Sequence, residues 1–362
     1  MEEIGGLRVN PSNVPCMSKA IWPQRCLDLW RTGDSLRHFM LVMAVFYLAS
    51  LAALSFVGLR PAVPWGFTLL LPVLFVPFAL IFLFYSRHQM HPALDTAAAV
   101  VILVAYQHFM IWPILAIGLL LSRSVEKIQY QWRLIRDGVV TTVLGYAALW
   151  NLNYLLARLV PTVHDSSLRA SDEWIYSWFF SSVSYKDFFP ILHDAFLVQV
   201  LNSAYMVLFP EVSLVLLLVC QTGEAGRVTR FLKGLFAFYT IGVMCFLIYP
   251  AIGPCLYYPD SLDPKQANLL VEGMLHDYHA AISGGTLKGY GYFIALPSLH
   301  VMVALYLQRC LVSFAGLYRV FLPVNVMLIL STVVLGYHYV IDALFAVLIM
   351  GIWMMLQKRF TI

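Results

Sequence analysis

Long apolar runs recur along the 362-residue chain, and short polar stretches separate them. Each run is close to the roughly 20 residues that an α-helix needs to cross the hydrocarbon core of a bilayer. The runs are too long and too uniformly apolar for the alternating strands of a membrane barrel. The pattern therefore predicts an all-α polytopic membrane protein with nine spans. The predicted spans are Phe39 to Leu59, Pro64 to Tyr85, Ala97 to Leu121, Gly138 to Val160, Phe196 to Cys220, Gly234 to Tyr249, Leu299 to Phe314, Val320 to Leu335 and Tyr339 to Leu356.

These spans divide the chain into two regions. Residues 1–137 carry about three spans whose role the sequence does not indicate, and residues 138–362 carry six spans and the candidate chemistry. Two longer polar stretches interrupt the second region. Pro161 to Leu192 is rich in aromatic residues, which favour the headgroup zone, so we expect it to lie at the membrane interface. Ala251 to Tyr292 carries several turn signals and is the other stretch.

The composition supports the membrane assignment and excludes other classes of protein. Hydrophobic residues make up 61% of the chain and charged residues only 12%, whereas a soluble domain carries about a quarter. The net charge of +4 is small, and the basic residues form no stripe along the chain. Nucleic-acid binding is therefore not expected. Lys and Arg concentrate on one side of the six later spans, which places both long stretches on the extracytoplasmic or luminal side. Nine spans with a cytoplasmic C-terminus would put the basic N-terminus outside, so either one of the first three segments is re-entrant or the charge rule fails locally.

Two short motifs carry the candidate chemistry. ALPSLH contains Pro297, Ser298 and His300 and begins the seventh span. STVVLGYHYVID contains His338 and Asp342 and bridges the last two spans. The connection between those spans is short, so both histidines are expected at the same end of the bundle. His338 and Asp342 are four residues apart, which places them on one helical face.

This arrangement of residue types suits phosphoryl transfer. The carboxylate of Asp342 is expected to orient the His338 ring, so that its other nitrogen attacks phosphorus. His300 can protonate the departing oxygen and later take a proton from the acceptor. Pro297 suits the first position of a helix, whose N–H groups form an anion cradle with the Ser298 hydroxyl.

The two motifs, PSxH followed by S-x4-G-x-H-x3-D, resemble two signatures of the type 2 phosphatidic acid phosphatase superfamily. The residues around them are most similar to those of the inositol phosphorylceramide synthases of fungi and protozoa. The resemblance covers about Gly138 to Leu356. It implies a six-helix core, a phosphohistidine intermediate on His338, Asp342 as its partner, and His300 as acid and base.

Two departures from the superfamily concern the phosphate contacts. The upstream KxxxxxxRP signature is missing, and Thr332 stands where the phosphatases have arginine. Other groups must therefore neutralise the phosphate. Lys288 and Arg158 are the preferred cationic candidates, and Lys186 is a weaker one. The candidate phosphate-binding residues are Ser298, Lys288, Arg158, Ser331 and Gly336, and the candidate residues of the headgroup pocket are Tyr257 and Tyr258.

The sequence thus predicts a lipid phosphotransferase that moves a phosphoryl headgroup from a phospholipid to a lipid alcohol. If water is the acceptor, the same site is a lipid phosphate phosphatase. A transporter or a structural membrane protein is the remaining alternative. We expect no metal or other cofactor, membrane lipids as partners, and a bacterial inner membrane or Golgi-type membrane as location, depending on the organism. The sequence does not indicate the oligomeric state.

Overall fold

The computed structural model describes residues 21–59, 125–160, 162–179, 195–257, 269–288 and 293–359, and these residues form helices and no β-strand. The prediction of an all-α protein is therefore confirmed. The predicted spans Pro64 to Tyr85 and Ala97 to Leu121 lie outside the described residues. The helices are α1 (Ile21–Phe56), α6 (Val125–Leu159), α7 (Asp165–Phe179), α8 (Ala195–Met206), α9 (Leu208–Gln221), α10 (Ala225–Ile248), α11 (Pro254–Tyr257), α12 (Leu269–Ser283), α13 (Leu299–Cys310), η4 (Leu311–Ser313), α14 (Ala315–Val334) and α15 (Val340–Arg359).

Five of the described helical segments are long and apolar enough to cross a membrane, and two shorter apolar helices accompany them. The protein is therefore a polytopic membrane protein. The shorter helices carry the two motifs. The five segments are Leu36–Phe56, Asp137–Leu159, Phe196–Gln221, Ala225–Ile248 and Ala315–Val334, and the two shorter ones are Leu299–Ser313 and Val340–Leu356.

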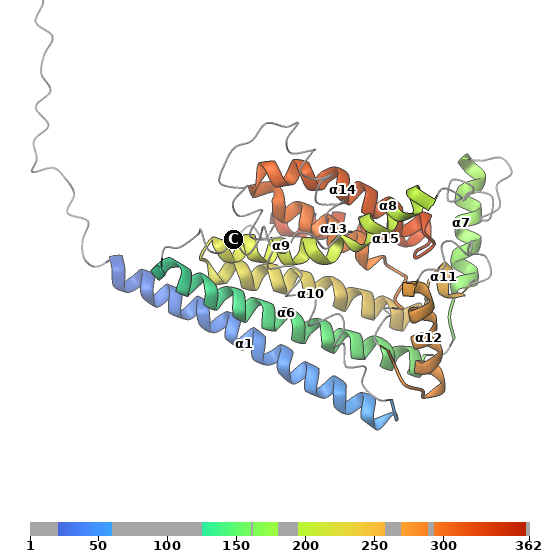
Figure 1. The fold of residues 1–362 in the computed structure, drawn as a ribbon, viewed down its shortest axis with the longest axis horizontal. Coiled ribbons are helices and arrows are strands. Elements are labelled where there is room, and N and C mark those ends of the chain that lie inside the picture. The colour runs from blue at the N-terminus through green and yellow to red at the C-terminus, as the bar shows by residue number, and fades with distance from the viewer. Residues whose placement is uncertain are drawn as a thin grey trace, which may run out of the picture.

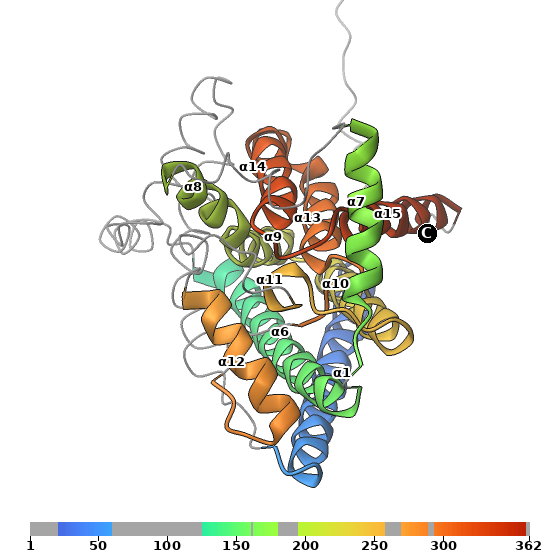
Figure 2. The same cartoon turned by 90° about the vertical axis from the view of Figure 1, so that its right-hand side faces the viewer.

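The long helices run side by side, whereas α7 and α12 lie across one end of the bundle (Figure 1). Helix α1 packs along α6, and α13 packs against α14 and α15. Figure 2 looks onto the end where α7 passes in front of α15, and the two helices are in contact. The residues between α14 and α15, and those that precede α13, lie at this end.

The predicted span Phe196 to Cys220 is divided into α8 and α9 at Val207. Pro210 is three residues into α9 and has no N–H to donate. A proline ring also clashes with the carbonyl four residues earlier, here that of Met206, the last residue of α8. Glu211 follows the proline and is fully buried. The predicted span is therefore interrupted beside a buried acid.

Helix α10 begins at Ala225, nine residues before the predicted start of that span at Gly234. The predicted start of this span is wrong, because the basic residues Arg227, Arg230 and Lys233 belong to the helix and not to the loop before it. Arg227, near the start of α10, makes an ion pair of 2.7 Å with Glu224, the residue before the helix. The helix therefore continues from the apolar core into a basic, solvated turn. Such an extension has no apolar pattern from which it could be predicted.

Candidate active site

His338 lies in the turn between α14 and α15. Gly336 in this turn has a φ of +73°, a left-handed conformation that favours glycine. The main-chain N–H of His338 donates to the carbonyl of Thr332 at 2.9 Å and folds the turn back onto the end of α14. Only 5% of His338 is exposed. The turn therefore directs the His338 ring into the protein at the end of the bundle.

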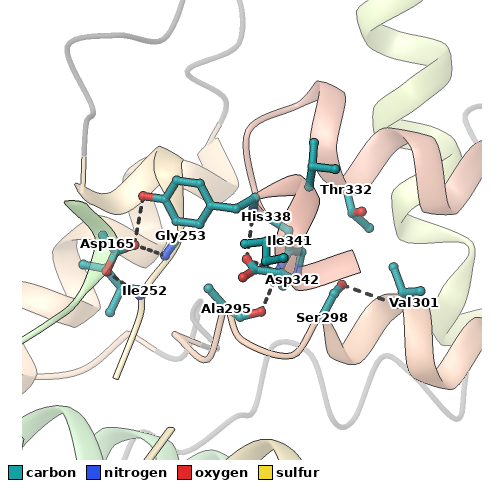
Figure 3. A network of polar contacts seen from close by, with 12 residues as sticks. Asp165, Ile252, Gly253, Ala295, Ser298, Val301, Thr332, His338, Ile341 and Asp342 are labelled. Carbon is teal, nitrogen blue, oxygen red and sulfur yellow. Dashed lines mark hydrogen bonds and ion pairs between the residues drawn. The ribbon is translucent and has the colours of Figure 1, made fainter. Parts of the chain in front are cut away.

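The hydrogen bond of Nδ1 fixes the tautomer of His338. Nδ1 lies 2.9 Å from the main-chain carbonyl oxygen of Ala295 (Figure 3). A carbonyl oxygen can only accept, so Nδ1 carries a proton. In the neutral ring the lone pair is then on Nε2. His338 thus has a nucleophilic nitrogen whose direction is fixed from the opposite side of the ring.

The carboxylate of Asp342 does not accept the hydrogen bond that we predicted from the His338 ring. Its Oδ2 lies 3.6 Å from Nδ1 of His338, which is close enough for an ion pair and too long for a hydrogen bond. The same oxygen accepts the main-chain N–H of Tyr339 at 2.9 Å. The tight turn brings that N–H to the carboxylate, while Ala295 takes the place at the ring. Asp342 therefore acts on His338 through its charge and by holding the first turn of α15.

His300 lies beside His338, with ring centroids 5.9 Å apart. The His300 ring stacks on Tyr205 at 4.1 Å, and Tyr205 stacks in turn on Tyr337 at 4.2 Å. Nε2 of His300 is buried and has no hydrogen-bond partner among the described residues. Stacking therefore fixes the plane of the ring and leaves one nitrogen available to a bound substrate.

The start of α13 differs in one detail from the prediction. Ser298 is the N-cap, and its hydroxyl accepts the main-chain N–H of Val301 at 3.4 Å. Pro297 therefore precedes the cap instead of occupying the first helical position. The main-chain N–H of Ser298 donates to the carbonyl of Asp342 at 3.2 Å. This bond joins the PSLH motif directly to the start of α15.

A mostly apolar pocket opens onto both histidines. Its lining includes Tyr205, Phe209 and Tyr337 in addition to His300 and His338, and further residues come from α6, α10 and α12. No lysine or arginine lines this pocket within the described ranges. The site therefore has two titratable rings in surroundings that disfavour water, and its lining is suited to the apolar part of a lipid.

The predicted phosphate-binding residues outside the motif turns lie in other contacts. The guanidinium of Arg158 donates to the carbonyl of Ile282 at the end of α12. The main-chain N–H of Lys288 donates to the Asp277 carboxylate at 2.6 Å. Neither Arg158 nor Lys288 lines the pocket of the two histidines. Their role in phosphate binding stays a prediction, and Lys186 lies outside the described residues.

The remaining candidates also make local contacts. The Ser331 hydroxyl donates to the carbonyl of Leu328 within α14. The carbonyl of Gly336 accepts the main-chain N–H of Cys255 at 2.8 Å, so this glycine anchors the turn to α11. Tyr257 ends α11 with 37% of its surface exposed, and Tyr258 lies outside the described residues. The phosphate- and headgroup-binding roles of these residues stay predictions.

Three residues of this site were not singled out from the sequence. Tyr205 stacks between the two motifs, and Asp165 and Asp172 of α7 bind main-chain N–H groups beside them. An aromatic residue in an apolar span has no pattern that marks it as a stacking partner. Acidic residues in an interfacial helix are equally unremarkable in sequence, because their partners are backbone groups far along the chain.

Replacing Gly253 with alanine is expected to lower activity about tenfold or more, because a shift of the His338 turn misplaces the reacting ring. Gly253 has a φ of +90°, and a Cβ there would collide with the main-chain oxygen of Tyr337. Gly223 is the matched control, since its φ is +73° and a Cβ would meet nothing within 4 Å. Steady-state rates of both variants decide the point. Equal losses would show that left-handed strain alone, and not the collision, explains the effect.

Comparison with known proteins gives one family match. Residues 178–356 match the family model of the PAP2 superfamily. The matched region contains α8 to α14 and most of α15, and therefore both histidines and Asp342. Comparison with curated proteins and with solved structures gives no match.

Proposed function

We propose that this chain, whose residues 178–356 match the family model of the PAP2 superfamily, is a lipid phosphotransferase of the inositol phosphorylceramide synthase type. The observation that carries the proposal is the pair of imidazoles in one pocket, with centroids 5.9 Å apart. His338 has its lone pair on Nε2, and the buried Nε2 of His300 has no partner within the described residues. One ring thus offers a lone pair for attack and the other a nitrogen that is available to a substrate oxygen, which suits a nucleophile and an acid.

In the first step, Nε2 of His338 attacks the phosphorus of a phospholipid donor. The bond between phosphorus and the diacylglycerol oxygen breaks, and protonated His300 gives its proton to that oxygen. The headgroup phosphoryl is then bound to His338 and the His300 ring is neutral. The positive charge that develops on His338 is stabilised by Asp342 at 3.6 Å.

In the second step, neutral His300 takes the proton from a lipid alcohol. The alcohol oxygen attacks phosphorus and the bond to Nε2 breaks, so both histidines return to their first states. Ceramide is the proposed alcohol, since the aromatic and aliphatic lining suits a long-chain acceptor. The same lining disfavours water in this step, which supports transfer over hydrolysis. The active site is proposed to face the extracytoplasmic or luminal side.

The proposal is tested with purified protein in phosphatidylcholine vesicles that contain phosphatidylinositol and ceramide. Mass spectrometry of the products is expected to show inositol phosphorylceramide and diacylglycerol in equal amounts. The control variant is His279→Asn, because His279 is an exposed histidine of α12, and it should form the same products. Release of inorganic phosphate from phosphatidic acid without headgroup transfer would instead identify a phosphatase. No turnover of either lipid would reject the enzyme.

A further inference from the structure

Helix α7 has one buried face, and this face holds two carboxylates against the catalytic end of the bundle. Asp165, Leu168, Asp172 and Tyr176 are buried and recur at helical spacing, whereas Trp174 on another side of the helix is 61% exposed. The helix lies across the end of the bundle, outside the apolar segments (Figures 1 and 2). Two carboxylates on such a face need partners, because burial without hydrogen bonds is costly.

Asp172 finds its partners at the start of α15. Its Oδ2 accepts the N–H of Val340 at 2.8 Å, and its Oδ1 accepts the N–H of Ile341 at 3.2 Å. The first N–H groups of a helix have no partner within that helix. Asp172 therefore caps α15 from a different helix, and it does so at the two residues that separate the Tyr339 turn from Asp342.

Asp165 holds the other side of the same region. Its carboxylate accepts the N–H groups of Ile252 and Gly253 at 3.0 and 2.8 Å, and the hydroxyl of Tyr339 at 3.1 Å (Figure 3). Tyr339 directly follows His338. The loop that Asp165 binds is joined in turn to Ala295, whose N–H donates to the carbonyl of Ala251 at 2.9 Å. Ala295 supplies the oxygen that orients the His338 ring.

We propose that Asp165 and Asp172 are positioning residues that set the place of His338 and Asp342 from outside the membrane-spanning core. The inference rests on the proposed function, because it assigns these carboxylates to the same reaction. Asp172 fixes the start of α15, and Asp165 fixes both Tyr339 and the loop behind Ala295. Neither residue lies in the matched region 178–356, so the role comes from the contacts and not from the family.

Burying these carboxylates close to one another is energetically unfavourable, which supports a role for them beyond simple packing. Burial, with a smaller contribution from the nearby charge of Asp342, raises the pKa of Asp172 to about 7 and that of Asp165 to about 6. Three carboxylates thus gather near one helix start, where main-chain N–H groups, the Tyr339 hydroxyl and the helix dipole offset their repulsion. A neutral residue at these positions would avoid the repulsion. It would not supply two acceptors to two adjacent N–H groups.

The test compares Asp172→Asn with Glu173→Gln in the full-length protein. The amide has one acceptor oxygen where the carboxylate has two, so one N–H of α15 loses its partner. Glu173 is the matched control, because it is the next residue, is exposed and pairs with Arg169 along the surface. The probe is phosphatidylinositol with radioactive phosphate, and rapid quenching gives both the rate of protein labelling and the amount of labelled protein.

We expect Asp172→Asn to lower the labelling rate about 10- to 100-fold with unchanged final labelling, because a misplaced nucleophile reacts slowly at every site. Glu173→Gln should match the unchanged protein. A normal rate with less labelled protein would mean that Asp172 only maintains folding, and would overturn the positioning role. Absence of label in the unchanged protein would instead refute the proposed function, which separates the two failures.

Amide hydrogen exchange provides a second measurement if labelling of the variant is too weak. Faster exchange confined to residues 338–342 supports the positioning role, because these amides lie at the capped start of α15. Faster exchange spread through α6 and α10 as well would show that Asp172 holds the whole fold, and would overturn it. Asp165→Asn should give the same local pattern around Ile252 and Gly253, whose N–H groups it binds.

Discussion

Replacing His338 with asparagine is expected to lower headgroup transfer by a factor on the order of 10⁴, because the attacking nitrogen is removed. Asparagine suits the test, since its amide N–H can still donate to the carbonyl of Ala295 and hold the turn. The remaining groups are left in place, so the loss reports the nucleophile and not the fold. Product formation by mass spectrometry, with and without the substitution, gives the factor.

The covalent step predicts a second property of the same variant. Donor lipid with radioactive phosphate should label the unchanged protein in a bond that is stable to base and labile to acid, as expected for a phosphorus–nitrogen bond. His338→Asn should take up no label, and His279→Asn should take up the normal amount. Transfer within a few-fold of normal in His338→Asn would show that His338 is not the nucleophile, and would end this mechanism.

The fold follows from the sequence wherever apolar length decides the outcome. The apolar runs that lie in the described residues are helical, because the backbone must satisfy its hydrogen bonds internally in lipid, but α1 and α6 begin 18 and 13 residues before the predicted spans. Pro210 accounts for the break between α8 and α9, which the predicted single span does not include, since proline removes a donor at a defined position. The start of α10 at Ala225 was not predictable in this way, because its first turns carry Arg227 and other basic residues and no apolar run.

The candidate catalytic side chains can be picked out from the sequence, but the groups that support them cannot. The motifs identified His300, His338 and Asp342 because imidazole and carboxylate side chains at these spacings have a recognisable chemistry. The group that orients His338 is the carbonyl of Ala295, and every residue has a carbonyl. Asp165 likewise binds main-chain N–H groups that no residue type marks. Hydrogen bonds to main-chain groups depend on how the chain folds, and the residue types in one sequence do not reveal them.

Charge neutralisation is the part of the site that the described residues do not provide. The pocket of the two histidines is lined by aromatic and aliphatic side chains, and no lysine or arginine is among them in the described ranges. Phosphoryl transfer usually relies on cationic groups around the transferred oxygens. In this site the imidazoles themselves are the available cations, since His300 begins the cycle protonated in the proposed mechanism. In the proposed mechanism His300 therefore serves both as the proton donor and as a cation beside the transferred phosphoryl group.

Replacing His300 with asparagine is accordingly expected to slow transfer from phosphatidylinositol by about 10²- to 10⁴-fold, the range of a general acid and base. The two steps should respond differently to the choice of donor. With p-nitrophenyl phosphate, the leaving group departs without a proton, so labelling of His338 should recover in the variant. Discharge of the label to ceramide should stay slow, because the acceptor hydroxyl must still lose its proton to a base.

The His300→Asn protein should therefore accumulate labelled enzyme from p-nitrophenyl phosphate, whereas the unchanged protein passes the label on. Rapid quenching followed by gel separation measures the labelled fraction, and His279→Asn should behave as the unchanged protein does. Equal slowing with both donors would show that His300 acts on the transferred phosphoryl group and not on the leaving oxygen. Because His300 stacks on Tyr205 at 4.1 Å, a purely structural role would instead reduce the labelled amount with either donor. Accumulation with one donor only is thus the result that identifies His300 as the proton carrier between the two lipids.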